Sequence, residues 1–143
     1  MAGLRPERVG ERLAEVRDRI ERAGGDWRAI TLVAVTKDFG SDAVEAAAAN
    51  GLVDVGENRA DQLVEKATAV DGAIRWHYLG RVQRNKVAAL APHVSVWQAV
   101  DRLAAGEEIA ERRGGAGGGG GATGAGSSYG SYSSYSSSST SPK

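Results

Sequence analysis

Four short apolar segments alternate with helix-forming segments between residues 30 and 112, and this alternation limits the folds that the chain can adopt. The first segment, residues 30–36, is rich in β-branched residues and almost without polar alternation, which predicts a buried strand with both faces covered. The other predicted strands span residues 52–56, 73–79 and 94–100. A repeated strand-helix unit requires right-handed crossovers and a parallel sheet. We therefore predict an α/β fold, either a barrel or an open doubly wound sheet.

Predicted helices precede and separate these strands. A helix from about Pro6 carries apolar residues at steps of three and four on one face and charged residues elsewhere, and it ends at a pair of glycines. Ser41 is expected to cap the next helix, which Gly51 ends in a left-handed conformation. Further helices are expected over residues 60–70, 85–90 and 103–112, the last capped by Asp101. No G-x-G-x-x-G sequence follows the first strand, so a Rossmann fold is disfavoured.

Composition divides the chain after residue 113. Residues 114–143 contain 10 of the 20 glycines, 10 serines and no acidic residue, which predicts a disordered low-complexity tail. Residues 1–113 carry 17 basic and 18 acidic side chains, so we expect no nucleic-acid-binding surface. The chain has no cysteine, which excludes disulfides and thiolate chemistry, and we assign no metal ligands. Without an apolar run of membrane-spanning length, we expect a cytoplasmic protein that does not associate with membranes.

Polar side chains lie in or directly after the predicted strands, whose carboxyl ends form the ligand sites of parallel α/β folds. Lys37 follows the first strand, where partial desolvation would let its amine attack an aldehyde, although most such lysines simply extend into solvent. Asn58 follows the second strand and either contacts a ligand or caps the next helix. His77 lies between Trp76 and Tyr78 and is expected to face the opposite side of the third strand, as a ligand neighbour or as a hydrogen-bonded interior histidine.

Three ordered segments resemble the pyridoxal phosphate homeostasis protein family. They are Val-Ala-Val-Thr-Lys at 33–37, Gly-Glu-Asn at 56–58, and Trp-His-Tyr-Leu-Gly-Arg-Val-Gln-Arg-Asn-Lys at 76–86. The third matches the family pattern W-H-[aromatic]-[aliphatic]-G-x-[aliphatic]-Q-x-N-K throughout. The resemblance implies a TIM-type (β/α)8 barrel like the N-terminal domain of alanine racemase. Four strands make about half of such a barrel, so we expect residues 1–113 to form a truncated N-terminal half, followed by the tail of residues 114–143.

The resemblance also implies a cofactor and a role. Pyridoxal 5′-phosphate would be held as an internal aldimine on Lys37, with Asn58 and His77 close to its ring. The family is regarded as non-enzymatic, buffering the cofactor and delivering it to acceptor amines or apo-enzymes by transimination. The family holds the phosphate and the pyridine nitrogen with later barrel segments, so weakened binding is expected here. Open strand edges would make the chain unstable or prone to self-association.

Two other functions remain open from the sequence. An alanine-racemase-like enzyme fragment would use Lys37 as a proton-transfer base, but racemases need a second base, usually a tyrosine, that cannot be assigned here. Alternatively, the tail carries the activity as an interaction segment, with Tyr129, Tyr132 and Tyr135 as stacking groups. An aldimine absorbance that disappears in Lys37→Ala would favour the cofactor-binding function, racemisation would favour the enzyme, and no aldimine at all would favour the tail.

Overall fold

The structure, a computed structural model, describes residues 4–114, so almost all of the predicted tail lies outside the described part. Its elements in chain order are α1 (Pro6–Arg22), the 3-10 turn η1 (Trp27–Ala29), β1 (Ala34–Val35), α2 (Ser41–Ala49), β2 (Asp54–Glu57), α3 (Ala60–Ala69), β3 (Arg75–Tyr78), α4 (Arg84–Leu90), β4 (Val94–Trp97) and α5 (Leu103–Gly114). The predicted alternation of strands and helices is confirmed over this range.

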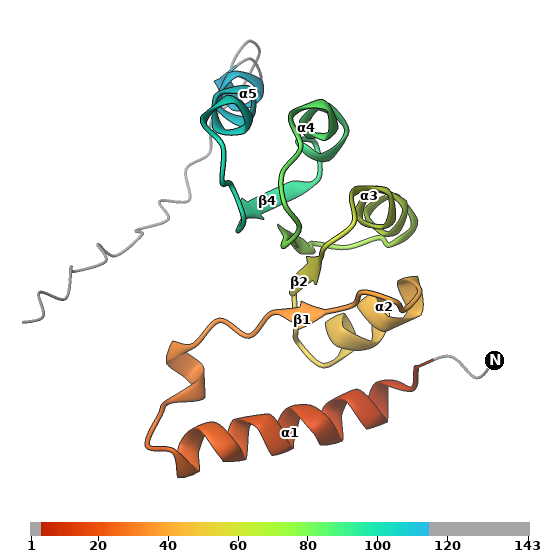
Figure 1. Cartoon of the computed structure of the whole chain (residues 1–143). Coiled ribbons are helices and arrows are strands. Elements are labelled where there is room, and N and C mark those ends of the chain that lie inside the picture. The colour runs from red at the N-terminus through yellow and green to blue at the C-terminus, as the bar shows by residue number, and fades with distance from the viewer. Residues whose placement is uncertain (1–3, 115–143) are drawn as a thin grey trace, which may run out of the picture.

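The four strands form one parallel sheet in the order β1-β2-β3-β4. Helices α2, α3, α4 and α5 fan around one side of the strands in the same order, while α1 lies beyond β1 (Figure 1). A doubly wound sheet would reverse its strand order and carry helices on both faces, whereas consecutive parallel strands with helices outside form the wall of a barrel. The prediction of a partial TIM-type barrel with outer helices is therefore confirmed.

The helix ends agree with the predictions in position more than in capping chemistry. Gly51 ends α2 with a φ of 78°, as its lack of a Cβ allows. Ser41 does not cap this helix: the N-cap residue is Gly40, and no side-chain capping bond forms. Asp101 lies before α5 as expected, but its carboxylate forms an ion pair with the Arg81 guanidinium, 2.8 Å away. Short polar residues near a helix start thus identified the boundary without identifying the cap.

The prediction that both faces of the first strand are covered is wrong. Only Ala34–Val35 is paired as a strand, and Ile30 and Val35 are 47% and 49% exposed. The physical reason is that β1 lies at the edge of the sheet and only one of its faces meets helices. The β-branched composition identified the strand correctly, but it could not show whether a second layer of protein covers the other face.

Residues of the strands alternate between two different environments. Trp76 and Tyr78 point toward the helices and pack with Leu63 and Val87 in the apolar core, and we call this side the outer face. His77 points to the other side, which no described helix covers and which we call the inner face. The predicted opposite orientation of His77 and its aromatic neighbours is confirmed, as the two-residue period of a strand requires.

Candidate functional site

Lys37 and Asn58 lie at neighbouring strand tips. Val35 of β1 is in register with Gly56 of β2, and the Thr36 N–H extends this pairing by donating to the Gly56 carbonyl over 3.1 Å. Each strand ends within two residues of this point, so Lys37 and Asn58 lie just beyond the paired residues of two neighbouring strands. The carboxyl edge of the sheet therefore carries an amine and a carboxamide at adjacent strand ends, where parallel α/β folds form their ligand sites.

The backbone around Lys37 forms a tight turn. The Phe39 N–H donates to the Thr36 carbonyl over 3.1 Å, and Asp38 adopts a left-handed conformation with a φ of 67°. Such a conformation costs a non-glycine residue about 1 kcal/mol. The Lys37 side chain is exposed and has no hydrogen-bond or ion-pair partner among the described residues. The partial desolvation considered for it is therefore not found, but its amine is free to react.

Asn58 does not cap a helix. The N-cap residue of α3 is Arg59, which makes no side-chain capping bond, so the capping interpretation of Asn58 is wrong. The Asn58 side chain is exposed and unpartnered within residues 4–114. Its backbone lies against Gly80, where a Cβ would overlap the Asn58 carbonyl oxygen. Glycine at this position lets the tips of β2 and β3 approach each other and leaves the carboxamide of Asn58 available.

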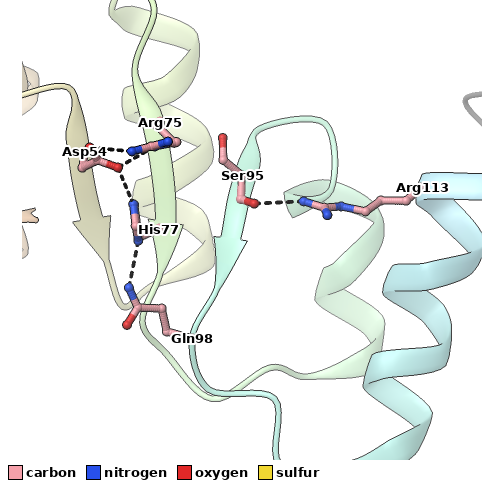
Figure 2. A network of polar contacts seen from close by, with 6 residues as sticks. All are labelled: Asp54, Arg75, His77, Ser95, Gln98 and Arg113. Carbon is pink, nitrogen blue, oxygen red and sulfur yellow. Dashed lines mark hydrogen bonds and ion pairs between the residues drawn. The ribbon is translucent and has the colours of Figure 1, made fainter. Parts of the chain in front are cut away.

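His77 is held in a polar network on the inner face (Figure 2). It is only 5% exposed, and its Nε2 and Nδ1 atoms lie 2.8 Å from Asp54 Oδ1 and from Gln98 Nε2. As placed, the Gln98 amide donates to Nδ1, which assigns the ring proton to Nε2 and lets Nε2 donate to the Asp54 carboxylate. Both ring nitrogens are therefore occupied, and the interior-histidine interpretation describes the contacts of His77.

Asp54 links this network to solvent. The Arg75 Nε donates to its Oδ1 atom over 2.6 Å, and this bond, with a smaller contribution from His77, holds the pKa of Asp54 below its ordinary value. His77 lies one residue before Tyr78, the last residue of β3, which places it about 3 Å behind the end of its strand. The site thus consists of the exposed side chains of Lys37 and Asn58 at the strand ends and, behind them, the hydrogen-bonded network of His77.

A second polar network lies on the outer face, directly behind the tip. Lys66 of α3 forms an ion pair with Glu57 and donates to the Thr36 carbonyl over 2.8 Å, and the Thr36 hydroxyl donates to Glu57 over 2.7 Å. Glu57 is fully buried, and its Oε2 atom has no partner in the described part of the chain. The network fixes the residue that precedes Lys37, because Thr36 contributes both its hydroxyl and its carbonyl.

The sequence reasoning missed both networks. Lys66 lies three residues after Leu63, on the helix face that packs against the sheet, so its place on that stripe was an available signal. Asp54 shares the inner face with His77 by alternation, but Gln98, the second partner of His77, lies beyond the end of β4. Only the register of β2, β3 and β4 brings these three side chains together.

The donor set limits the chemistry of the site. Within residues 4–114, no three histidine, aspartate or glutamate side chains gather as metal ligands would. No helix in that same range is long and apolar enough to cross a membrane. What the tip offers is a free primary amine and a free carboxamide, which suit a carbonyl compound with hydrogen-bonding groups.

Comparison with known proteins gives a consistent result. No protein-family model matches the chain. The pyridoxal phosphate homeostasis proteins of Pseudomonas aeruginosa and Aquifex aeolicus are both 34% identical to it, over 108 and 107 residues. These alignments cover 75% and 71% of this chain and 47% of each relative. The solved structure of PipY from Synechococcus elongatus with pyridoxal phosphate bound superposes with a TM-score of 0.66 at 29% identity, covering 76% of this chain and 50% of that one. The chain thus spans about half the length of the relatives it matches.

Proposed function

Because the chain belongs to the pyridoxal phosphate homeostasis protein family over about three quarters of its length, we propose that it binds pyridoxal 5′-phosphate and takes part in the intracellular homeostasis of this cofactor. The observation that carries the proposal is the unpartnered amine of Lys37 just after β1, with the unpartnered carboxamide of Asn58 just after the neighbouring strand β2. We assign this role to residues 1–113. Residues 115–143, which hold the tyrosines of the alternative tail function, lie outside the described part of the chain.

We propose Lys37 as the covalent anchor of the cofactor. Bound pyridoxal phosphate supplies an aldehyde carbon with which a lysine amine condenses, losing one water. The other lysines of residues 4–114 fit this role less well. The amine of Lys66 is buried in its ion pair with Glu57, and Lys86 lies in the first turn of α4 and not directly after a strand. Lys37 is the described lysine that combines a free amine with the position of a ligand site.

Asn58 and His77 are proposed as neighbours of the cofactor ring, with different roles. The Asn58 carboxamide is free to donate to or accept from a polar group of the ring. His77 cannot offer a ring nitrogen without giving up Asp54 or Gln98, so it contributes the edge or face of a ring held in a fixed orientation. The Asp54 carboxylate keeps that orientation by accepting a hydrogen bond from the Nε2–H.

The described residues favour holding and release of the cofactor over racemisation. A racemase needs a second base on the opposite side of the substrate, usually a tyrosine. Tyr78, the one tyrosine within residues 4–114, lies on the outer face, and burial raises the pKa of its hydroxyl. We therefore propose a non-enzymatic role in which acceptor amines or apo-enzymes take the cofactor from Lys37. We also propose weaker binding than in full-length relatives, because the described residues correspond to only half of their chain.

The test is to locate the covalent bond. The 143-residue chain is mixed with pyridoxal phosphate at less than one equivalent, reduced with borohydride, digested and analysed by mass spectrometry, while absorbance follows complex formation before reduction. We expect the label on Lys37 and loss of the absorbance change in Lys37→Ala. The matched control Lys86→Ala should behave as the unchanged chain, because Lys86 is an exposed helix lysine.

Three outcomes would contradict the proposal. An equal distribution of label over Lys37 and Lys86 would show ordinary surface reactivity in place of a site. An unchanged absorbance in Lys37→Ala would show that another group holds the cofactor. Racemisation of alanine by the loaded protein, lost in Lys37→Ala, would favour the enzymatic alternative.

A further inference from the structure

The sheet has two free edges. β1 pairs only with β2 and β4 only with β3, and no other described strand lies beside them. Alternate residues of a parallel strand direct their backbone groups to opposite sides. Thr36 bonds to β2, so the N–H and carbonyl of Val35 face the free edge of β1. On β4 the register with β3 is irregular at Ser95, and the carbonyl of Ser95 accepts a bond from Arg113 outside the sheet. Unpaired edges of this kind are templates for another strand.

Exposed apolar side chains gather beside these two edges. Seven large apolar side chains within residues 4–114 are exposed. Three of them, Val16, Ile30 and Val35, belong to the α1 and β1 end of the sheet, and two, Val100 and Leu103, belong to the β4 and α5 end. Val53 precedes β2, and Phe39 lines a pocket on the helix side with residues of α3. Exposed apolar surface concentrated in this way marks an interaction site more than chance exposure does.

The β1 edge also has an apolar groove beside it. The groove has a volume of about 440 Å³ and lies between α1 and the segment that leads into β1. Its apolar walls come from Val9, Leu13, Val16, Leu32, Val33 and Leu52. A strand added to β1 would direct every second side chain toward α1, and this groove offers room for those side chains.

One side chain of α5 covers part of the free β4 edge. The Arg113 side chain, from the last turn of α5, donates to the Ser95 carbonyl over 2.9 Å, on the side of β4 that faces away from β3 (Figure 2). Long charged side chains are a common protection of strand edges. Because this contact is exposed, an incoming strand could displace it at a small cost in free energy.

We propose that two copies of this chain pair head to tail, with β4 of each copy lying parallel to β1 of the other, and so close an eight-stranded barrel. The described sheet has four strands with one free β1 edge and one free β4 edge, so pairing with a second copy gives a wall of eight strands. Each copy contributes one β1 edge and one β4 edge, so two copies pair every edge and the assembly closes. This interface does not depend on pyridoxal phosphate.

The assembly state of the cofactor-free, 143-residue chain tests the proposal. Analytical ultracentrifugation over a range of concentrations should give a reversible species of twice the 14.9 kDa chain mass. A monomer at every concentration would overturn the proposal, and so would a ladder of growing masses, because open chains of copies do not close a barrel.

Edge variants locate the interface. Val35→Lys places a charge at the free β1 edge, and Ser95→Pro removes an N–H from the free β4 edge, where proline is tolerated. Each should weaken dimerisation roughly tenfold or more. The matched control Val53→Lys changes a side chain of similar exposure, 45% against 49%, away from both edges and should leave the dimer unchanged. Circular dichroism shows whether each variant keeps its fold.

Mixing the two edge variants makes the test independent of any single substitution. A Val35→Lys copy keeps its β4 edge and a Ser95→Pro copy keeps its β1 edge, so an equimolar mixture should form a heterodimer through one intact interface. If dimers instead joined β1 to β1, Ser95→Pro would remain dimeric by itself and the mixture would gain nothing. That result would overturn the head-to-tail pairing even if Val35→Lys failed to fold.

Discussion

The two faces of the same sheet each carry a polar network, and their burial differs. On the outer face, Glu57 and Lys66 lie between the strands and α3, both almost completely buried. On the inner face, the ion pair of Asp54 and Arg75 reaches solvent, since half of the Arg75 side chain is exposed. The two acidic residues belong to one four-residue strand, and alternation alone sends them to opposite faces.

The difference shows how one strand can serve both stability and a binding site. The outer network joins β1, β2 and α3 and holds the backbone of Thr36 in place behind the tip. The inner network holds His77 but leaves the tip itself open. We infer that the outer network positions the site and that the inner face receives the ligand.

Among the substitutions that test this comparison, removing the buried cation of Lys66 should lower the stability of the chain the most. Lys66→Met leaves Glu57 buried without its counter-charge, which should lower the free energy of unfolding by about 3 to 5 kcal/mol. Urea denaturation followed by circular dichroism measures the loss. Lys86→Met makes the same change on an exposed face of α4 and should stay within about 0.5 kcal/mol of the unchanged chain. Equal effects of the two substitutions would show that the outer network does not stabilise the fold.

The close approach of β2 and β3 at the tip should give the next largest effect. In Gly80→Ala the new Cβ would overlap the Asn58 carbonyl oxygen, so the backbone must move and about 1 to 3 kcal/mol of stability should be lost. Gly106→Ala is the control, because Gly106 is the fourth residue of α5 and its Cβ would meet nothing nearer than 3.7 Å. There alanine should stabilise the chain by about 0.5 to 1 kcal/mol. Effects of the same sign at both positions would contradict the steric argument.

The inner network should make the stability of the folded chain depend on pH. The Arg75 guanidinium lowers the pKa of Asp54 in the folded chain, while the unfolded value is about 3.9. Its contribution to stability is therefore complete above the unfolded pKa and lost as pH falls through the folded pKa. Asp54→Asn should cost roughly 1 kcal/mol at neutral pH and little in strong acid, where the carboxyl is protonated.

Thermal unfolding at a series of pH values measures whether the stability difference between Asp54→Asn and the unchanged chain disappears in acid. Asp61→Asn is the control, since the pKa of Asp61 is lowered in the same direction, first by its hydrogen bond to Arg59, but both side chains are exposed. Its curve should run close to that of the unchanged chain. A constant gap between Asp54→Asn and the unchanged chain at all pH values would mean that packing, and not charge, explains the loss.

The order of elements could be predicted from sequence because each element carries its own local signal. The apolar stripe that begins near Pro6 predicted α1, and the run of β-branched residues at 30–36 predicted β1, although the paired part is shorter. Whether β1 is covered on its inner face depends on strands that are not neighbours in the sequence. No local pattern contains that information, which explains the wrong prediction for Val35.

The candidate site divides in the same way. Lys37 and Asn58 could be placed at strand ends from sequence, because each directly follows a predicted strand, and the resemblance to the family assigned their roles. The partners of His77 could not be predicted, because Asp54 and Gln98 lie 23 and 21 residues away and meet it only through the strand register. The roles of Lys37, Asn58 and His77 toward the cofactor stay predictions until the labelling experiment is done.

The smallest effect on stability should come from the residue most important for the proposed function. Lys37→Met removes an exposed amine with no partner among residues 4–114, so the free energy of unfolding should change by no more than about 0.5 kcal/mol. A ligand that binds only the folded chain raises its melting temperature. Pyridoxal phosphate should therefore stabilise the unchanged chain in a thermal melt and leave Lys37→Met unaffected.

Lys37 and Lys66 lie near the end of the same strand, on opposite faces of the sheet. The comparison of the two faces therefore predicts that Lys37→Met loses stabilisation by the ligand but keeps its folding stability, whereas Lys66→Met loses folding stability. A Lys37→Met variant that unfolded as easily as Lys66→Met would show that the amine at the tip supports the fold, and the assignment of the inner side to ligand binding would then be wrong.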